Sequence, residues 1–299
     1  MSTPVLVGGF AAAEATRILD AACRLAGLDP TGAVLLRGHT NAVFRLRSAP
    51  VVAKVARSGT QLAEVSRTVR LIQWLTSLDF PTVRLFPVEQ PVVVEAHAVT
   101  FWVYLPQPDH PVSAAQIADP LRQLHQLPTP PVPLRALDTV GAIRRSIGAI
   151  TVLGADDLQF LTDRVDHLEK ELAALRYPLP PAILQGDPQH RNALHDGPDA
   201  VLCDWDTTAF GPPEMDLVTV EIHCRRFGYG KAHYRAFADR YGFDVTAWEG
   251  YPVLRDLREL RMITTNAKRT DASGRTLAEV ADRIDGLRRG DDGMRWHIL

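Results

Sequence analysis

Three polar residues in the second half of the chain have the types and the spacing that phosphoryl transfer requires. Asp187 precedes Asn192 by five positions, and Asp204 follows a short apolar run at residues 200–203. Phosphoryl transfer uses one carboxylate to accept the proton of the attacking hydroxyl, and a carboxamide and a second carboxylate to bind a metal ion. The pattern therefore predicts that Asp187 accepts the proton and that Asn192 and Asp204 bind Mg²⁺.

The order and spacing of these residues resemble those of the aminoglycoside phosphotransferase family, whose members are related to the protein kinases. The resemblance extends over residues 33–220, and its most specific part is LQGDPQHRNALHDGPDAVLCDWDTTAFGPPEMDL, residues 184–217. It implies a bilobal protein-kinase-like fold of the α+β class, with ATP or GTP and Mg²⁺ as cofactors. The implied reaction is transfer of the γ-phosphoryl group to a hydroxyl of a small molecule.

Four residues near the predicted catalytic loop are expected to support it. Asp206 either assists a second metal ion or hydrogen-bonds locally, and Asp216 is expected to cap the following helix and brace the loop. The sequence departs from the family at Gln185, where a histidine is usual, and a glutamine amide can make the same bracing hydrogen bonds. His190 is a candidate contact for the γ-phosphate or the acceptor, or else a solvated loop residue.

Lys54 is the only lysine among the first 169 residues, and it lies in the apolar segment VVAKVA. An ammonium group there is costly unless it meets a charged partner and an anion. The resemblance implies that Lys54 holds the nucleotide phosphates and that Glu64, on the following helix, orients it. The alternative is an edge-strand lysine whose ammonium group reaches solvent, with Glu64 solvated as well.

Two backbone segments are expected to contact the nucleotide. The connection one strand ahead of Lys54 has the position of the family's phosphate-covering loop, although such a segment is also typical of a simple hairpin turn. It contains Gly38, His39, Thr40 and Asn41. The end of the last strand has the position of the family's hinge, so the backbone at Val103 and Leu105 is expected to bind the base, whether of ATP or of GTP.

A small β-rich lobe is predicted to carry these nucleotide-binding residues. Apolar positions at helical spacing predict one helix at 11–26 and another after residue 62. Three short strands are expected between residues 33 and 57, and two more at 91–97 and 98–106. The prediction is a five-stranded sheet with one inserted helix, in a nucleotide-binding lobe of residues 1–105.

Residues 106–299 are predicted to form a larger, mainly helical lobe with the catalytic loop and the acceptor pocket. Helices are expected at 117–128 and 155–176, with a Pro-rich connector after the first. Four histidines without ligand spacing are expected to be structural: His97, His125, His223 and His233.

The composition narrows the classes of partner. The net charge of −2 indicates neither nucleic acid nor an anionic membrane surface. No apolar run approaches the roughly 18 residues of a membrane span, and the N-terminal segment is a poor signal peptide because no basic residue precedes its apolar patch.

The three cysteines fit neither a disulfide framework nor a zinc pattern, which suits a reducing cytoplasm. The oligomeric state is not indicated.

The sequence alone does not identify the acceptor. The leading prediction is an antibiotic or a sugar- or nucleoside-type metabolite, and the alternative is a metabolic kinase for a sugar, amino sugar, choline-like alcohol or homoserine. A nucleotide-binding pseudokinase does not require the complete set of polar residues, and a protein kinase is disfavoured because no long activation loop follows Asp204. From residue 217 onward basic residues outnumber acidic ones, unless carboxylates such as Glu221, Asp256 and Glu259 cluster at the cleft. This favours a neutral, weakly charged or anionic acceptor over a polycation.

Overall fold

The computed structural model describes residues 12–38, 41–270 and 274–298. The chain divides into two compact units. The first comprises the residues up to Pro111 together with 130–133 and 194–206, and the second comprises 112–129, 134–193 and 207 onward. The sequence suggested a division at residue 105, whereas the first unit also includes the segment that leads to Asp206.

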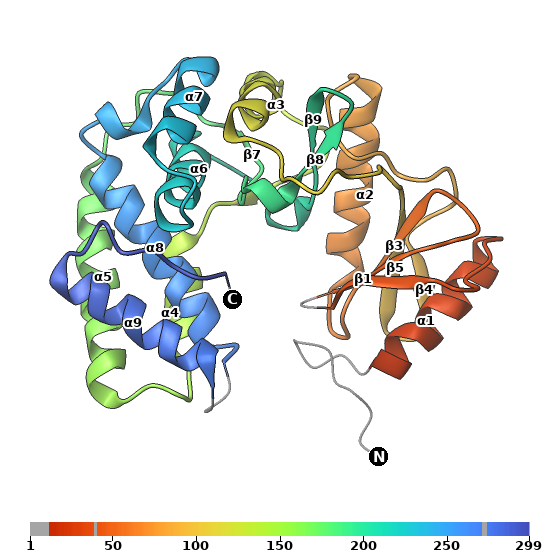
Figure 1. Ribbon diagram of the computed structural model, residues 1–299, viewed down its shortest axis with the longest axis horizontal. Coiled ribbons are helices and arrows are strands. Elements are labelled where there is room, and N and C mark those ends of the chain that lie inside the picture. The colour runs from red at the N-terminus through yellow and green to blue at the C-terminus, as the bar shows by residue number, and fades with distance from the viewer. Residues whose placement is uncertain (1–11, 39–40, 271–273, 299) are drawn as a thin grey trace. The chain divides into compact units, whose positions relative to one another are not determined.

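The first unit contains a five-stranded antiparallel sheet (Figure 1). Its strand order is β1-β2-β3-β5-β4. The predicted five strands and inserted helix are confirmed, because α2 (Leu62–Ser77) follows the third strand. The strands are β1 (Val34–Gly38), β2 (Ala42–Arg45), β3 (Val51–Val55), β4 (Val92–Val94) and β5 (His97–Val103).

Helix α1 (Ala12–Leu25) covers one face of this sheet. Its stripe of buried residues, including Ile18 and Leu19, packs in one core with Val51, Ala53 and Val55 of β3. Successive side chains of a strand point to opposite faces. Lys54 therefore lies on the face that α1 does not cover, where a polar site can form without disturbing the core.

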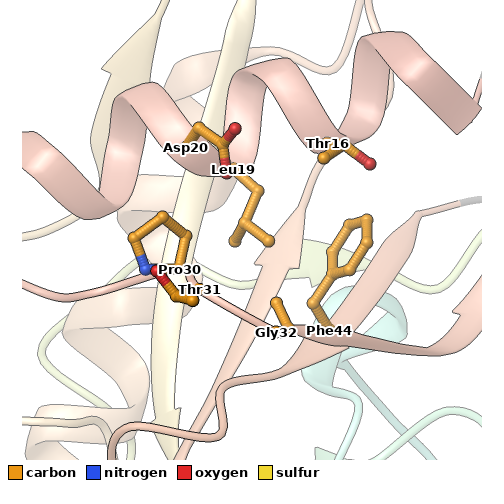
Figure 2. A pocket seen from close by; sticks show the side chains of 8 residues that line it. Thr16, Leu19, Asp20, Pro30, Thr31, Gly32 and Phe44 are labelled. Carbon is orange, nitrogen blue, oxygen red and sulfur yellow. The ribbon is translucent and has the colours of Figure 1, made fainter.

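A pocket of about 340 Å³ lies beside α1, between Leu19 and Phe44 of β2 (Figure 2). Its described lining also includes Asp20, Pro30 and Thr31. None of the predicted site residues is among these lining residues, so the pocket gives no support to the predicted chemistry.

A short hairpin carries the chain toward Asp204. It consists of β8 (Ala193–Asp196) and β9 (Asp199–Leu202). Leu202 is fixed to the first unit by its backbone, since its N–H donates to Pro81 O at 3.0 Å and its carbonyl accepts from Val83 N at 3.1 Å. The position of Asp204 beside the sheet follows from this pairing.

The second unit is mainly helical, as predicted. Helix α8 contacts four others, α4, α5, α6 and α9, and is thus central to the packing (Figure 1). A three-stranded sheet of order β6-β10-β7 and helix α4 were not predicted from sequence. No helix in the described part of the chain combines the length and the apolar character needed to cross a membrane. The helices and strands are α3 (Ala114–Gln126), β6 (Arg135–Ala136), α4 (Thr139–Ile147), α5 (Ala155–Ala174), β7 (Ala182–Leu184), β10 (Ala209–Gly211), α6 (Glu214–Arg226), α7 (Lys231–Tyr241), α8 (Tyr251–Ala267) and α9 (Arg275–Arg289).

Candidate functional site

Lys54 lies between two carboxylates in the first unit. Its Nζ is 3.1 Å from Asp204 Oδ1 and 2.7 Å from Asp206 Oδ2. The lysine side chain is 19% exposed, whereas the two aspartates are each about half exposed. Burial lowers the pKa of Lys54, but Asp204 and Asp206 outweigh it and raise this pKa overall, so the ammonium form is kept. The cluster thus combines two solvent-accessible carboxylates, those of Asp204 and Asp206, with the ammonium group of Lys54.

The backbone at Asp204 has an unusual conformation. Its φ of 59° lies in the left-handed region, which costs a non-glycine residue free energy and occurs often at functional sites. The next residue, Trp205, is buried and donates from Nε1 to Thr82 Oγ1 at 3.0 Å. This anchor holds the turn that directs both aspartates toward Lys54.

The predicted phosphate-covering loop is described at its two ends. Gly38 ends β1 and pairs with Ala42, while His39 and Thr40 lie outside the described residues. The side chain of Asn41 donates from Nδ2 to Asp206 Oδ2 at 3.2 Å. Asn41 is thereby brought to the same carboxylate as Lys54.

The remaining nucleotide-side residues have different surroundings. Glu64 lies in the first turn of α2, and its pairing with Lys54 stays a prediction, since the carboxylates on Lys54 are those of Asp204 and Asp206. At the predicted hinge, Val103 N–H donates to Arg84 O at 2.9 Å, and the N–H of Tyr104 is also bonded within the chain. Within the described residues, Leu105 is the hinge position whose N–H has no acceptor.

Asp187 lies in the second unit, and both of its carboxylate oxygens accept hydrogen bonds. Oδ2 accepts from Gln189 Nε2 at 2.8 Å and from Asn192 Nδ2 at 3.1 Å. Oδ1 is ion-paired with Nη2 of Arg258. Asn192 also donates to the backbone oxygen of Asp187 at 2.9 Å, so its own carbonyl oxygen is the atom left to ligate a metal.

The segment before Asp187 is braced from α6. Asp216 accepts hydrogen bonds from the N–H groups of Gln185 at 2.8 Å and Gly186 at 2.9 Å. Gln185 in turn accepts from the N–H of Asp187 at 2.6 Å. Asp216 lies in the first turn of α6, where Pro213 is the N-cap residue, so it makes bracing contacts and does not cap the helix.

Gly186 meets two constraints that other residues cannot. Its φ is +87°, and a Cβ built there would lie 2.4 Å from the backbone oxygen of Thr207. The close approach of two backbone segments therefore requires glycine immediately before Asp187.

His190 is buried in a group of polar side chains. Its Nε2 is 2.9 Å from His233 Nε2, and its ring stacks on Tyr229. Burial, followed by the effect of neighbouring histidines, lowers the pKa of His190 to about 3, so the imidazole is neutral. Cys224 completes a trio with ligand atoms within 4.8 Å of one another. Positions 190, 224 and 233 have no regular spacing, so this proximity cannot be predicted from the sequence.

Arg258 is the residue at this site that sequence reasoning missed. It lies on α8, 71 positions after Asp187, among many arginines of the C-terminal helices. No local pattern distinguishes it from the others. Its side chain is 16% exposed, and its Nε is buried without a hydrogen-bond partner among the described residues.

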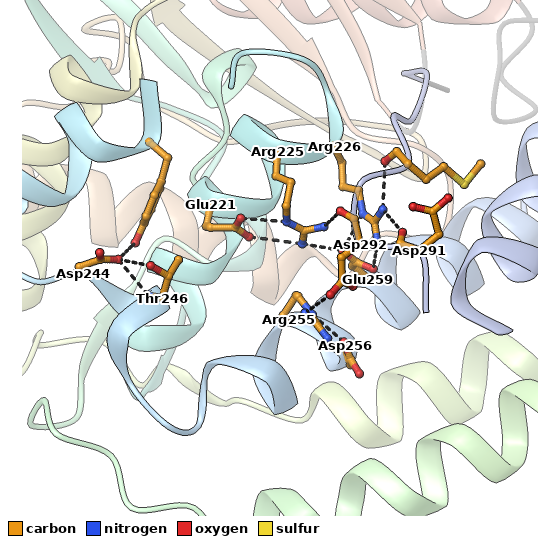
Figure 3. Close-up of polar contacts among 12 residues, drawn as sticks. Glu221, Arg225, Arg226, Asp244, Thr246, Arg255, Asp256, Glu259, Asp291 and Asp292 are labelled. Atoms are coloured by element: carbon orange, nitrogen blue, oxygen red, sulfur yellow. Dashed lines mark hydrogen bonds and ion pairs between the residues drawn. The ribbon is translucent and has the colours of Figure 1, made fainter. Parts of the chain in front are cut away.

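The acidic residues considered for a cation-binding pocket are paired with arginines (Figure 3). Glu221 binds Arg225 at 2.9 Å, and Glu259 binds Arg226 at 2.7 Å. Asp256 also has arginine partners, namely Arg164 and Arg255. Their negative charge is neutralised inside the helical unit.

Comparison with known proteins relates both halves of the chain to one family. A family model described as the phosphotransferase enzyme family matches residues 31–257. No curated protein matches the chain.

Solved structures of similar fold include kinases for different small molecules. Amicoumacin kinase hAmiN, in complex with AMP-PNP, Ca²⁺ and Ami, is 14% identical over 94% of this chain and 95% of its own, with a TM-score of 0.72. A choline/ethanolamine kinase family protein from Mesorhizobium loti is 17% identical over 93% of each chain, with a TM-score of 0.68. Aminoglycoside phosphotransferase APH(3'')-Id from Streptomyces rimosus, with ADP and streptomycin, is 20% identical over 80% of this chain and 96% of its own, with a TM-score of 0.57. These matches confirm the predicted kinase-like fold.

Proposed function

Because the chain belongs to the phosphotransferase enzyme family and is a phosphotransferase with a hydroxyl acceptor, we propose that it transfers the γ-phosphoryl group of ATP to a small molecule. The observation that supports this most is the cluster of Lys54 with Asp204 and Asp206, which combines a cation for phosphates with carboxylates for a metal ion. GTP remains an alternative donor, because the proposed contact to the base is the backbone of Leu105.

The carboxylates of Asp204 and Asp206 suit Mg²⁺ in donor type, because this ion prefers oxygen ligands and keeps several waters. Both groups are about half exposed, which leaves room for those waters. A bound Mg²⁺ would neutralise charge on the transferred phosphoryl group. We propose that Lys54 then exchanges its carboxylate partners for phosphate oxygens, and that Glu64 and Asn41 orient the surrounding groups. Asn192 is proposed as a further ligand on the basis of its free carbonyl oxygen.

Asp187 is proposed as the group that receives the proton of the acceptor hydroxyl. Hydrogen bonds from Gln189 and Asn192 fix one carboxylate oxygen, and the bracing of Gln185 and Asp216 fixes the backbone. A carboxylate held in this way can orient a hydroxyl and accept its proton as the phosphoryl group is transferred. His190 is neutral and buried, and its role is proposed to be positioning of the loop instead of contact with phosphate.

Two other functions compete with this proposal. A metabolic kinase for a sugar, amino sugar, choline-like alcohol or homoserine would use the same residues, and the similar structures include kinases for unrelated acceptors. A pseudokinase would bind nucleotide without transfer. The arrangement of Asp187 argues against it, since nucleotide binding alone does not need a braced carboxylate.

Magnesium-dependent transfer from radiolabelled ATP is the direct test, with a panel of antibiotics, sugars, nucleosides and small alcohols. Incorporation of label into at least one alcohol, lost in Asp187→Asn, is the expected result. Tight Mg·ATP binding without transfer to any member would favour the pseudokinase.

A further inference from the structure

Two arginines lie on one face of α8, and the first of them contacts the proposed proton acceptor. Arg258 and Arg261 are three positions apart, which places them one turn from each other on the same side of the helix. Arg258 is paired with Asp187. A guanidinium group therefore lies directly at the proposed catalytic carboxylate, and a second one lies a turn away on the same helix.

Arg261 has no carboxylate partner among the described residues. Its hydrogen bonds go to two neutral oxygens of α4, Ser146 Oγ at 3.0 Å and Ala142 O at 3.3 Å. Burial, followed by the nearby arginines beginning with Arg258, lowers the pKa of Arg261 to about 10. A partly buried guanidinium without a counter-charge is unfavourable, and an anion placed beside it would relieve this cost.

Other arginines of the helical unit differ from this pair. Arg225 and Arg226 bind Glu221 and Glu259, and Arg255, on the same helix as Arg258, binds Asp256 and Asp292 (Figure 3). The carboxylates that could have formed an acidic acceptor pocket are therefore paired, whereas Arg261, one turn from Arg258, has only neutral partners among the described residues.

We propose that the acceptor carries an anionic group, a carboxylate or a phosphate, which binds Arg258 and Arg261 while its hydroxyl meets Asp187. This inference rests on the proposed function of Asp187. The planar guanidinium fork matches the oxygens of carboxylate and phosphate, and charge-assisted hydrogen bonds of this kind are the strong ones. The buried Nε of Arg258, which has no partner in the described chain, is an additional donor for such a group.

The ion pair between Arg258 and Asp187 gives the anion a second role. In the acceptor-free protein, Arg258 occupies Oδ1 of Asp187. An anion that takes over Arg258 releases this oxygen, which can then accept the proton of the hydroxyl on the same molecule. Binding of the acceptor's anionic group to Arg258 and release of Asp187 Oδ1 are therefore one event. A neutral alcohol has no anionic group and cannot displace Arg258 in this way.

Anion binding to the nucleotide-free full chain tests the site independently of catalysis. Inorganic phosphate and malonate are titrated separately by calorimetry, so that the two kinds of anion are distinguished. Arg258→Gln and Arg261→Gln should each weaken binding of the preferred anion about tenfold or more, the effect of losing a charge-assisted hydrogen bond. Arg255→Gln is the matched control on the same helix and should bind as the wild type does. Circular dichroism spectra confirm folding of each variant.

Matched acceptors then connect this site to transfer. Glucose, glucuronate and glucose 6-phosphate, and likewise glycerol, glycerate and glycerol phosphate, differ in charge while sharing hydroxyl groups. An anionic member should have the highest kcat/KM, and Arg261→Gln should reduce that value about tenfold while the neutral member changes little. Arg258→Lys keeps the charge but not the fork, and should recover part of the activity lost in Arg258→Gln.

The two experiments separate failure of this inference from failure of the proposed function. Phosphate and malonate that bind wild type and Arg261→Gln equally, or a preference for neutral or cationic acceptors, would overturn the anion site and leave the kinase proposal intact. Anion binding that depends on both arginines, together with no transfer to any alcohol, would overturn the kinase proposal and leave the anion site.

Discussion

Lys54 Nζ lies 2.7 Å from Asp206 Oδ2, although the two residues are 152 positions apart in the chain. Strand β3 supplies the lysine, and the turn after β9 supplies the carboxylates. In the nucleotide-free unit, the ammonium group of Lys54 thus balances one of the two carboxylate charges. Under the proposed function, phosphates replace the carboxylates on Lys54 while a metal ion binds the aspartates, so nucleotide affinity is expected to depend on the metal.

Asp204→Asn is expected to abolish the magnesium-dependent part of nucleotide binding, because a hard, charged oxygen ligand is lost. Calorimetry with ATP, in the presence of Mg²⁺ and of EDTA, measures this difference. Asp199→Asn is the control, since Asp199 is an exposed carboxylate on the hairpin that precedes Asp204. Unchanged Mg·ATP affinity in Asp204→Asn would count decisively against the metal site.

Lys54→Met is expected to weaken nucleotide binding or turnover without unfolding the first unit. Methionine replaces the ammonium group with an apolar group of similar length, and the partly buried position can accept it. The thermal midpoint of the variant should therefore stay close to that of wild type, whereas its dissociation constant for Mg·ATP or its turnover should change. Retention of both wild-type affinity and wild-type turnover would mean that Lys54 does not hold phosphate.

Asp187→Asn removes the basic oxygen and keeps the shape of the side chain. Turnover should fall by about a hundredfold or more, whereas Mg·ATP affinity should stay close to wild type because Asp187 is not assigned to the nucleotide. Single-turnover kinetics with the true acceptor measures the chemical step. A variant with near-normal turnover would remove Asp187 from the role of proton acceptor.

Gly186→Ala should be more damaging than Gly197→Ala. Both glycines have positive φ, but a Cβ at 197 has no atom within 4 Å, whereas one at 186 meets the backbone of Thr207. Strain from φ alone costs about 1–2 kcal/mol, so Gly197→Ala gives the baseline in urea unfolding. Gly186→Ala should lose more stability than this and also turnover. Equal losses in the two variants would show that the segment can move away from Thr207.

The stability of the second unit should depend on pH through His223. Burial is the largest influence on the pKa of His223 and lowers it to about 4, well below its ordinary value, although the charge of Asp187 acts in the opposite direction. The unfolded chain therefore binds the proton first, so the stability contributed by neutral His223 is present above pH of about 6.5 and is lost as the pH falls toward 4. The free energy of unfolding should decrease over this range, and less steeply in His223→Gln. An identical slope in the variant would assign the effect to other groups.

Local patterns were sufficient for much of the fold and for residues whose roles depend on neighbours in sequence. The apolar segment around Lys54 indicated that its ammonium group needs a charged partner, and the step from Asp187 to Asn192 placed both on one loop. The partners that arise from tertiary packing were inaccessible, because Arg258 reaches Asp187 only through the position of α8 among the other helices. The sheet β6-β10-β7 was missed for a related reason, since its strands have two or three residues each and no measurable periodicity.

The environment of Asp187 also affects what the enzyme does when no acceptor is present. Water is always available as a competing nucleophile, and a kinase that activates it hydrolyses its donor without product. Here Gln189 and Asn192 occupy one carboxylate oxygen, and Arg258 occupies the other. Three of the roughly four acceptor positions of the carboxylate are thus taken, so the resting enzyme is expected to hydrolyse its nucleotide donor slowly until an acceptor displaces Arg258.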